Sequence, residues 1–494
     1  MIEMRLAEVA AVTGGELHRA TGDELVSSVE FDSRKVGPGA LFLALPGERA
    51  DGHGFAAAAV AAGASGVLAG RPVDAPSVIA PPGESYAGTD LGAADPDGAG
   101  AAVLTALGRL ARHSVTTLPD LHVVGITGSS GKTSTKDLVA AVLRPLGETV
   151  APPGSFNNEL GHPWTALQAG ESTRHLVVEL SARGRGHIAR LCRIAPPRIG
   201  VVLNVGSAHV GEFGSPEAIA QAKGELVEAL PADGVAVLNT DDPRVAAMAS
   251  RTKARAVGVG VGADADVRAE DVSLGAGRAS FTLVTPAGSA PVSLQLVGAH
   301  HVGNALAAAA VALELGGTPA QIAEALSAAT PASRWRMEVT ERADGVTVVN
   351  DAYNANPESM TAALQALASI GRGRRTWAVL GPMAELGDTT EAAHRRIADT
   401  VRGLGVDRFV AVGTDHYTRE SPTSDTRVPH SGHASPTPRT RESDTGPRVV
   451  ADRDAALALL RAELAPGDVV LVKASRSAGL DRVADALLQE LVSP

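Results

Sequence analysis

The segment best suited to chemistry is a glycine-rich turn that joins an apolar run to the polar start of a helix. Residues 123–134 read Val-Val-Gly-Ile-Thr-Gly-Ser-Ser-Gly-Lys-Thr-Ser. Glycines let backbone N–H groups close around phosphate oxygens, and the helix start adds its positive dipole. Lys132 would reach the β- and γ-phosphates, and the Thr133 hydroxyl would face Mg²⁺. The pattern predicts a nucleotide phosphate site rather than a Gly-Ser turn that happens to precede Lys-Thr.

The match to the strict phosphate-loop motif is imperfect, because Ile126 stands where that motif has glycine. The apolar run before the turn and the helical pattern after it still favour the phosphate site. The residues expected to contact the nucleotide phosphates are Gly128, Ser129, Ser130, Gly131, Lys132, Thr133 and Ser134.

An acid and an imidazole follow the next two apolar runs along the chain. Glu179 closes the run 175–180, and the run 198–205 leads to His209. Parallel sheets bind ligands at the carboxyl ends of their strands. Alone, Glu179 could form a surface ion pair and His209 could be a loop histidine. Beside the glycine-rich turn, we expect both to hold a divalent cation.

The elements that must position these residues are buried strands alternating with helical stretches. Continuous apolar runs, without polar alternation, are typical of parallel sheets covered on both faces. Two series occur, and helical patterns such as 304–315 and 357–370 lie between their members. The expected strands are 121–128, 175–180, 198–205 and 234–239, then 345–353, 376–381, 408–413 and 468–475.

These patterns predict an α/β protein of three domains. Residues 1–115, with short strands and Gly-Pro turns, form a small α+β domain. Residues 116–330 form a mostly parallel sheet with the nucleotide site, and residues 331–494 form a Rossmann-like α/β domain. The segment 415–448 is rich in Ser, Thr, Pro and Arg without apolar periodicity, so we expect a disordered insert there.

Composition narrows the class of protein. The 494 residues carry 44 basic and 55 acidic side chains, a net charge of −11, which argues against nucleic-acid binding and a polybasic membrane anchor. A single cysteine rules out a disulfide framework. The first residues lack the pattern of a signal peptide, and no stretch has the apolar density of a membrane-spanning helix. We expect a cytoplasmic enzyme that acts as a monomer.

Taken together, the motifs resemble the Mur ligase family, the ATP-dependent amide-bond-forming enzymes of bacterial cell-wall precursor synthesis. The resemblance runs along the whole chain except 415–448. Besides Glu179, it rests on segments in the family's order: TGSSGKTS (127–134), NVGSAHVGEFGS (204–215), AQAKGEL (220–226), HHVGNALAA (300–308), SRWRME (333–338) and NDAYNANPESM (350–360).

Within the family, the chain most resembles the branch that joins D-alanyl-D-alanine to UDP-N-acetylmuramoyl-tripeptide. The segments 351–357, 381–387 and 472–477 carry this likeness. The alternative is the branch that adds the third amino acid, which typically has Ala-His-Thr or Ala-His-Asn at the position of 354–356 and an Asn-Pro-Arg motif in its last domain. A folylpolyglutamate-synthase-like enzyme or a non-catalytic nucleotide-binding scaffold could also carry a phosphate-binding turn. The two alternative enzymes are not expected to turn over D-alanyl-D-alanine, and the scaffold predicts loss of the metal ligands, whereas Glu179, His209 and Lys223 are all present.

The resemblance implies ATP and two Mg²⁺ ions as cofactors and an acyl-phosphate intermediate. It gives catalytic roles to Lys132, Glu179, His209 and Lys223. Thr133 and Glu179 would hold the ion near the nucleotide, and Glu179, His209 and Lys223 the second ion. Asn304 would contact adenine, with a helix N-cap as the alternative. Arg334 and Asp351 would reach ATP from the last domain, and only when that domain closes.

The resemblance also implies where the substrates other than ATP bind. Ser33, Arg34 and Lys35 would meet the UDP-sugar, although a Pro-Gly turn with surface charges is the alternative. Lys473, Ser475 and Arg476 follow the last strand and would hold substrate carboxylates, with a plain structural cap as the alternative. The remaining residues expected to contact substrate are Asn157, Asn158, Tyr353, Asn354 and Asn356.

Lysine is scarce in this chain, since 38 of the 44 basic residues are Arg and six are Lys. A position that keeps Lys therefore suggests a need for a primary amine, because the two side chains are not interchangeable. An ammonium beside two cations would be repelled, whereas a CO₂-derived carbamate on Lys223 would supply oxygen ligands. We expect this carbamate; the alternative is a helix-surface lysine paired with Glu225 or Glu228.

Overall fold

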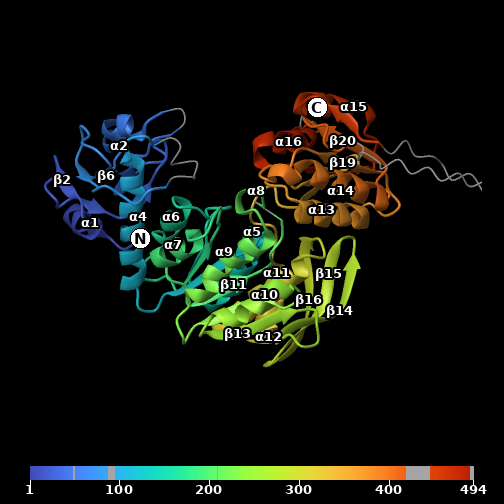
Figure 1. Cartoon of the computed structure of the whole chain (residues 1–494), viewed down its shortest axis with the longest axis horizontal. Coiled ribbons are helices and arrows are strands. Elements are labelled where there is room, and N and C mark those ends of the chain that lie inside the picture. Colours follow the sequence, from blue (N-terminus) through green and yellow to red (C-terminus); the bar gives the residue numbers. More distant parts are fainter. Residues whose placement is uncertain (48–49, 87–94, 208–209, 419–445, 490–494) are drawn as a thin grey trace, which may run out of the picture.

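The computed structural model describes residues 1–494 except 48–49, 87–94, 208–209, 419–445 and 490–494. Predicted metal ligand His209 and most of the expected insert lie outside the described residues. Figure 1 shows three α/β units that follow the chain in order, with the central unit between the N-terminal and C-terminal ones. This mixed α/β architecture confirms the predicted fold class.

The N-terminal unit is built on a five-stranded sheet in the order β2-β7-β6-β5-β4. Strands β4 to β7 run parallel and β2 pairs antiparallel at one edge. Its strands are β1 (Met4–Arg5), β2 (Glu16–His18), β3 (Leu25–Val26), β4 (Ser28–Glu30), β5 (Ala40–Leu43), β6 (Gly66–Ala69) and β7 (Ser77–Ile79). Its helices are α1 (Leu6–Thr13), η1 (Gly52–Phe55) and α2 (Ala56–Ala61).

The central unit carries a nine-stranded sheet in the order β16-β15-β14-β13-β12-β11-β8-β10-β9. The strands from β9 to β14 in this order are parallel, as the continuous apolar runs predict. They are β8 (His122–Thr127), β9 (Thr149–Val150), β10 (His175–Glu179), β11 (Ile199–Val202), β12 (Val235–Asn239), β13 (Arg255–Gly260), β14 (Val267–Gly275), β15 (Arg278–Thr285) and β16 (Gly288–Val297).

Strands β14, β15 and β16 form an antiparallel extension that the sequence patterns did not predict. Their signal is an alternation of buried and exposed residues, seen at Ala279, Phe281 and Leu283 of β15. One face of such a sheet is solvated, so its strands lack the continuous apolar runs of the parallel strands.

Helices cover both faces of the central sheet. One core cluster joins the sheet to α5, α11 and α12, and another joins it to α7 and α9. The helices of this unit are α5 (Lys132–Leu143), η2 (Arg144–Leu146), α6 (Gly161–Ala166), α7 (His187–Ile194), α8 (Val210–Phe213), α9 (Pro216–Glu228), α10 (Pro243–Ala246), η3 (Ala247–Arg251), α11 (His301–Glu314) and α12 (Pro319–Ala328).

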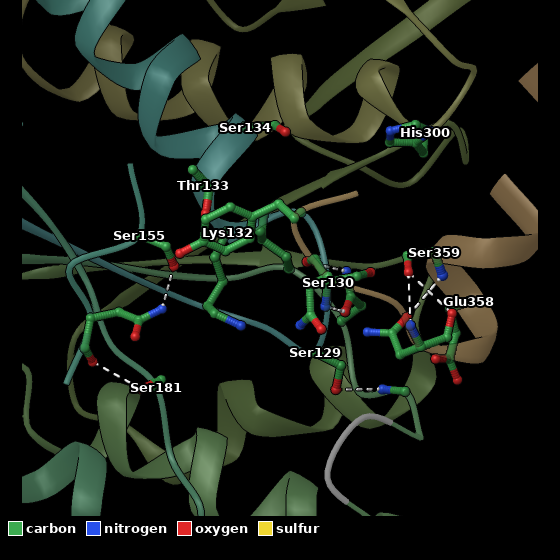
Figure 2. Close-up of a pocket in the computed structure, with 18 of the residues that line it drawn as sticks. Ser129, Ser130, Lys132, Thr133, Ser134, Ser155, Ser181, His300, Glu358 and Ser359 are labelled. Carbon is green, nitrogen blue, oxygen red and sulfur yellow. Dashed lines mark hydrogen bonds between the residues drawn. The ribbon is translucent and has the colours of Figure 1, made fainter. Parts of the chain in front are cut away.

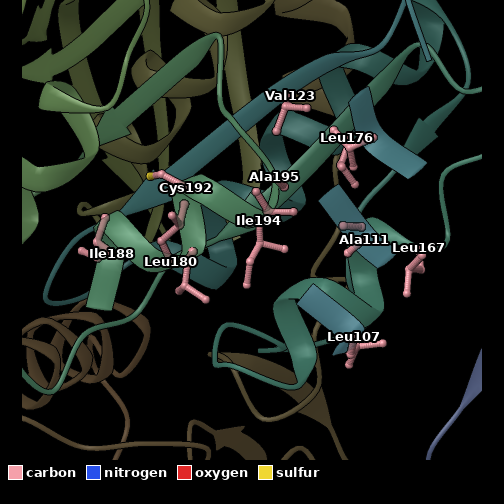
Figure 3. Packing of buried hydrophobic residues seen from close by; sticks show 14 of the residues in the cluster. Leu107, Ala111, Val123, Leu167, Leu176, Leu180, Ile188, Cys192, Ile194 and Ala195 are labelled. Carbon is pink, nitrogen blue, oxygen red and sulfur yellow. The ribbon is translucent and has the colours of Figure 1, made fainter. Parts of the chain in front are cut away.

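Helix α4 (Ala99–Thr117) belongs to both of these units. Its buried face packs on α1 and β6 and also on α6 and α7. Figure 3 shows Leu107 and Ala111 of α4 beside Leu167 and the residues of α7 in one continuous core. The predicted boundary after residue 115 therefore falls inside a helix that connects the two units.

The C-terminal unit has a six-stranded sheet in the order β17-β18-β22-β19-β20-β21, parallel except for the β17–β18 pair. Its strands are β17 (Glu338–Glu341), β18 (Thr347–Asn350), β19 (Thr376–Leu380), β20 (Arg408–Val412), β21 (Arg448–Val450) and β22 (Val469–Lys473). Its helices are α13 (Pro357–Ile370), η4 (Gly387–Thr389), α14 (Thr390–Gly403), α15 (Arg453–Glu463), η5 (Arg476–Ala478) and α16 (Asp481–Gln489).

The expected insert 415–448 is too wide at both ends. Tyr417 is 4% exposed, packs edge-on against Phe409 and donates a hydrogen bond from its hydroxyl to Gly381 O at 2.8 Å. Arg448 opens β21, which pairs with β20. The average composition of a polar segment does not reveal a single aromatic side chain that packs into the core, so the composition of 415–448 did not indicate that Tyr417 is buried.

Two deletions should therefore behave differently. Replacing 419–445 by a short Gly/Ser linker should leave the turnover number (kcat) within a few-fold, because the entropy of closing a connection changes only slowly with its length. Replacing 415–448 also removes Tyr417 and should cost about 3–5 kcal/mol of stability. Urea unfolding and ligase assays of both variants check this. Equal stability of the two variants would contradict it.

Candidate functional site

A cavity of about 1060 Å³ lies where the three units meet. Its wall includes Tyr86 from the N-terminal unit, the glycine-rich turn from the central unit and Lys473 from the C-terminal unit. In Figure 2, Lys132 and Thr133 lie near Ser155, and Ser129 and Ser130 lie toward Glu358 and Ser359 of the C-terminal unit. The site is thus shared between units, as expected for an enzyme that brings several substrates together.

The glycine-rich turn has the geometry of a phosphate cradle. It connects β8 to α5, and Gly131 adopts a left-handed backbone (φ 82°) immediately before the helix. The Lys132 ammonium donates a hydrogen bond to Gly128 O at 2.7 Å. Burial lowers the pKa of Lys132 to about 8, and the Glu179 carboxylate partly opposes that shift. Six of the seven predicted phosphate contacts line the cavity, and Gly128 does not.

Asn204 fixes the shape of this turn, a role that the sequence patterns did not predict. Its side-chain amide accepts a hydrogen bond from Ser130 N–H at 3.0 Å and donates one to Ser130 O at 3.1 Å. The Ser129 hydroxyl accepts a hydrogen bond from Gly206 N–H at 2.9 Å. The sequence did contain a signal for this role, because Asn204 comes shortly after the apolar run of β11, the strand that pairs with β8 and so lies next to the phosphate turn.

Glu179 ends β10 next to the phosphate turn and is 0% exposed, so the surface ion pair is excluded. Its Oε2 atom accepts hydrogen bonds from Thr133, Asn157 and Ser155 at 3.3, 3.3 and 3.4 Å. Its Oε1 atom is buried and has no hydrogen-bond partner among the described residues. A buried carboxylate with a free oxygen beside a threonine hydroxyl suits a hard divalent cation.

Lys223 lies on α9 and is 6% exposed, which excludes the helix-surface alternative. The two glutamates expected as its partners in that alternative contact different groups: Glu225 accepts from Gly186 N–H, and Glu228 pairs with Arg251. Lys223 has no hydrogen bond or ion pair with any described residue. Burial, and then the nearby charge of Lys132, lower its pKa well below the ordinary value for lysine.

Two of the three protein ligands expected at the second ion, Glu179 and Lys223, are among the described residues. Among the described residues, which exclude His209, no group of three or more His, Cys, Asp and Glu side chains is arranged to hold a metal ion. Thr133 nevertheless contacts Glu179, and Lys223 lies close enough to Lys132 for the two charges to interact. The metal role of His209 stays a prediction.

Asn304 lies within α11, whose N-cap is His300, so the N-cap alternative is excluded. Its side chain is buried, and its amide lies 3.3 Å from His301 Nδ1. A Cβ atom added at Gly131 would approach Asn304 Oδ1 to 2.9 Å. Asn304 therefore packs on the phosphate turn and lines the cavity, where it can reach a nucleotide.

The linker between the central and C-terminal units places Arg336 at the site instead of Arg334. Arg334 is exposed, lies over the Trp335 ring and does not line the cavity. Arg336 donates a hydrogen bond to Thr133 Oγ1 at 3.3 Å and lies 4.1 Å from the centroid of the Tyr353 ring. The segment contains two arginines two residues apart, and sequence spacing alone could not tell which one turns inward.

Lys473 and Asp351 form a buried ion pair with an Nζ–Oδ2 distance of 2.6 Å. The Lys473 ammonium also donates a hydrogen bond to Asn354 O at 2.8 Å, and Asp351 Oδ1 accepts one from Met337 N–H at 3.0 Å. Lys473 is 2% exposed. Two of the three donors of its ammonium are thus used within the protein, which favours the structural alternative.

The neighbouring predicted contacts also have protein partners. Ser475 Oγ accepts a hydrogen bond from Ala384 N–H at 2.9 Å. Arg476 pairs with Asp481 at 2.9 Å, and its guanidinium lies 4.2 Å from the Trp335 ring centroid. Asn356 is the N-cap of α13, where its side chain accepts from Ser359 N–H at 2.9 Å. The predicted substrate contacts that line the cavity here are Tyr353, Asn354, Asn356, Ser475 and Arg476.

The predicted contacts near the N-terminal unit divide into two groups. Ser33, Arg34 and Lys35 do not line the cavity, and Arg34 pairs with Asp32 at 2.8 Å, as the surface-charge alternative predicts. Asn157 and Asn158 do line it. Asn157 supports Glu179, and Asn158 Oδ1 accepts a hydrogen bond from Gly161 N–H at the start of α6.

No helix in the described part of the chain is long and apolar enough to cross a membrane.

Three family profiles match consecutive parts of the chain. The Mur ligase family, catalytic domain matches residues 25–92 and the Mur ligase middle domain matches 126–312. The Mur ligase, glutamate ligase domain matches 335–476. The three matches follow the order of the three units in the structure.

Curated and solved relatives cover almost the whole chain. It is 54% identical to the UDP-N-acetylmuramoyl-tripeptide–D-alanyl-D-alanine ligase of Mycobacterium tuberculosis (strain ATCC 25618 / H37Rv), with 99% of this chain and 98% of that protein aligned. A crystal structure of MurF from Acinetobacter baumannii has a TM-score of 0.81 at 29% identity and covers 99% of both chains. MurF from Thermotoga maritima in complex with ADP has a TM-score of 0.74 at 26% identity, covering 94% of this chain and 98% of that one.

Proposed function

The chain belongs to the Mur ligase family, and we propose that it joins D-alanyl-D-alanine to UDP-N-acetylmuramoyl-tripeptide with conversion of ATP to ADP and phosphate. The observation that carries this assignment is 54% identity, over the full length, to a ligase named for that reaction. The branch that adds the third amino acid is not favoured. The product is UDP-N-acetylmuramoyl-pentapeptide, a precursor of peptidoglycan, and we place the reaction in the cytoplasm, where ATP is available.

The chemistry needs activation of a carboxylate, which is a poor electrophile at neutral pH. An oxygen of the tripeptide's terminal carboxylate attacks the γ-phosphorus of ATP, the bond to the bridging oxygen breaks, and ADP leaves. The amine of D-alanyl-D-alanine then attacks the carbonyl carbon of the acyl phosphate and loses a proton. Phosphate leaves with the electron pair of the C–O bond, and the amide remains.

The cavity suits these reaction steps because its wall combines the phosphate cradle of the central unit with residues of the C-terminal unit. Lys132 and the backbone N–H groups of the turn hold the phosphates as charge moves toward the leaving oxygen. Arg336 enters from the linker and adds positive charge beside Thr133. A wall shared by the two units can exclude water from the acyl phosphate, which otherwise hydrolyses.

Thr133 and Glu179 would hold one Mg²⁺, and Glu179, His209 and Lys223 would hold a second. When bound, Mg²⁺ offsets the negative charge of phosphate and carboxylate oxygens that must approach each other. The buried, unpartnered Oε1 atom of Glu179 supports this assignment. Ser155 and Asn157 keep the second oxygen of Glu179 in place.

Lys223 would act as a carbamate. A lowered pKa leaves more of the amine neutral, and the neutral amine attacks CO₂, forms an N–C bond and releases a proton. The product carries one negative charge and oxygen donors. Its burial and its lack of a partner among described residues support this modification over an ordinary ammonium.

A substrate panel tests the proposed function. Purified enzyme, ATP and Mg²⁺ should release phosphate when UDP-N-acetylmuramoyl-tripeptide and D-alanyl-D-alanine are both present. The same assay with the dipeptide form of the nucleotide and a third amino acid should release none. Turnover only in that second assay would assign the chain to the branch that adds the third amino acid.

The two linker arginines provide a matched prediction. Arg336→Ala should lower kcat/KM for ATP by about 10²–10³-fold, through a higher KM, a lower kcat or both. The substitution removes a positive charge that lies beside the phosphate site. Arg334→Ala should stay within about twofold, because that side chain is exposed outside the cavity. Steady-state kinetics of both variants decide between the two arginines, and the reverse order of effects would restore Arg334 as the ATP contact.

A further inference from the structure

The C-terminal unit also touches the central unit through residues outside the covalent linker. We call this contact the docking seam; it consists of Arg183, Ser207 and Gly211 facing Glu358, Glu385 and Gly387. The Ser207 N–H donates a hydrogen bond to Glu358 Oε1 at 2.7 Å. Arg183 pairs with Glu385 at 3.6 Å. In Figure 1, α8 lies at the edge of the central unit that faces the C-terminal unit.

The closest fit in the docking seam is between two glycines. A Cβ atom at Gly211 would lie 2.7 Å from Gly387 N, 3.0 Å from Gly387 Cα and 3.1 Å from Glu385 O. All three are backbone atoms of the C-terminal unit, so they cannot turn aside as a flexible side chain would. Gly211 lies in helix α8, whose backbone conformation suits any residue. The need for glycine at 211 therefore comes from the contact with the C-terminal unit.

Two of the three residues on the C-terminal side of the docking seam, Glu385 and Gly387, belong to a segment, residues 381–387, that hydrogen bonds fix within its own unit. Tyr417 donates a hydrogen bond to Gly381 O at 2.8 Å, and Ser475 N–H donates one to Pro382 O at 3.0 Å. Met383 N–H donates to His394 Nε2 at 3.0 Å, and Ala384 N–H donates to Ser475 Oγ at 2.9 Å. The same segment places Ala384 and Glu385 in the cavity wall.

His394 is the buried partner at the middle of this segment. Its Nδ1 lies 2.7 Å from Thr390 O and acts as the donor, which leaves Nε2 as the acceptor for Met383. The side chain is completely buried. The ring contacts the His416 and Tyr417 rings, at centroid distances of 5.3 and 4.8 Å. His394, which does not line the cavity, thus fixes the segment at Met383.

We propose that the docking seam sets the register between the central and C-terminal units for ligation, with Gly211 and His394 as positioning residues. The inference rests on the proposed function, because it concerns the same cavity. ATP phosphates bind on the central unit, whereas the amide-forming step needs groups from both units. A steric block at the docking seam should therefore impair turnover without weakening nucleotide binding.

The test variant is Gly211→Ala, and Gly403→Ala is its control because a Cβ there meets no atom within 4 Å. Gly211→Ala should lower kcat at least about tenfold, because small displacements of reacting groups cost large factors in rate. Its Kd for ADP, measured by calorimetry, and its melting temperature should match those of the control. A kcat within twofold of the control, or loss of ADP binding along with kcat, would overturn the proposal.

A distance measurement separates this proposal from the proposed function. Spin labels at Ser250→Cys and Arg372→Cys, two exposed positions on the two units, report their separation. Gly211→Ala should shift or broaden the distance distribution, and an unchanged distribution would overturn the docking role whatever the enzyme's substrate proves to be. If the unsubstituted enzyme fails to use D-alanyl-D-alanine, only the proposed function fails.

His394 provides an independent variant. His394→Ala removes the acceptor for Met383 N–H and should lower kcat at least about tenfold. His394→Gln can offer an amide oxygen near the position of Nε2 and should recover most of that loss. Equal kcat values in the two variants would contradict a positioning role for His394.

Discussion

Lys223→Arg should abolish most ligase activity although it keeps a positive charge at the position. The guanidinium cannot form the carbamate, and the buried pocket, already beside the charge of Lys132, would then hold a second permanent cation. Loss of a direct metal ligand should exceed the 10–100-fold typical of its supporting residues, so we expect at least about a 100-fold decrease in kcat. Phosphate release under saturating substrates measures it.

Two further results belong to the same prediction. Lys223→Ala should lose activity to a similar extent and regain part of it when short carboxylic acids are added, because they can place a carboxylate in the vacated space. The unsubstituted protein should gain the mass of one CO₂ in native mass spectrometry under bicarbonate. Full activity of Lys223→Arg would exclude the carbamate as a requirement.

Lys473→Met should lower the free energy of unfolding by about 3–5 kcal/mol, because it leaves the Asp351 carboxylate buried without its cation. The urea midpoint of the C-terminal unit measures this loss. The prediction follows from the 2.6 Å ion pair and from the lack of exposure of Lys473.

The double variant Asp351→Asn/Lys473→Met is the control, since it removes both charges. It should be more stable than Lys473→Met, because neutral groups of similar shape avoid the unpaired charge. If Lys473→Met instead raises the KM for a substrate and leaves the urea midpoint unchanged, Lys473 holds substrate and its structural role is refuted.

The predicted order of elements agrees with the structure where long apolar runs define strands. The strands that carry the phosphate turn and Glu179 occur where expected, because a buried parallel strand needs a continuous apolar run. The antiparallel strands β14–β16 were missed, because their apolar residues alternate. An apolar residue at every second position is a weaker signal for a strand than a continuous apolar run.

Sequence spacing predicted which segments meet at the cavity but could not settle side-chain direction. Arg334 and Arg336 lie two residues apart in a linker of irregular backbone, where Trp335 and Met337 have positive φ angles of 60° and 49°. Such a backbone follows neither helical nor strand alternation, so no periodicity indicates which arginine faces the nucleotide. Lys473 pairs with Asp351, which lies 122 residues away in the chain, so local sequence patterns could not identify this partner.

An isotope measurement tests the central claim most directly. UDP-N-acetylmuramoyl-tripeptide labelled with ¹⁸O in its terminal carboxylate is incubated with enzyme, ATP and D-alanyl-D-alanine, and the released phosphate is analysed by mass spectrometry. The account predicts one ¹⁸O atom in each phosphate, transferred when the carboxylate attacks the γ-phosphorus and kept when the amine displaces phosphate. Unlabelled phosphate released together with pentapeptide would contradict ligation through an acyl phosphate.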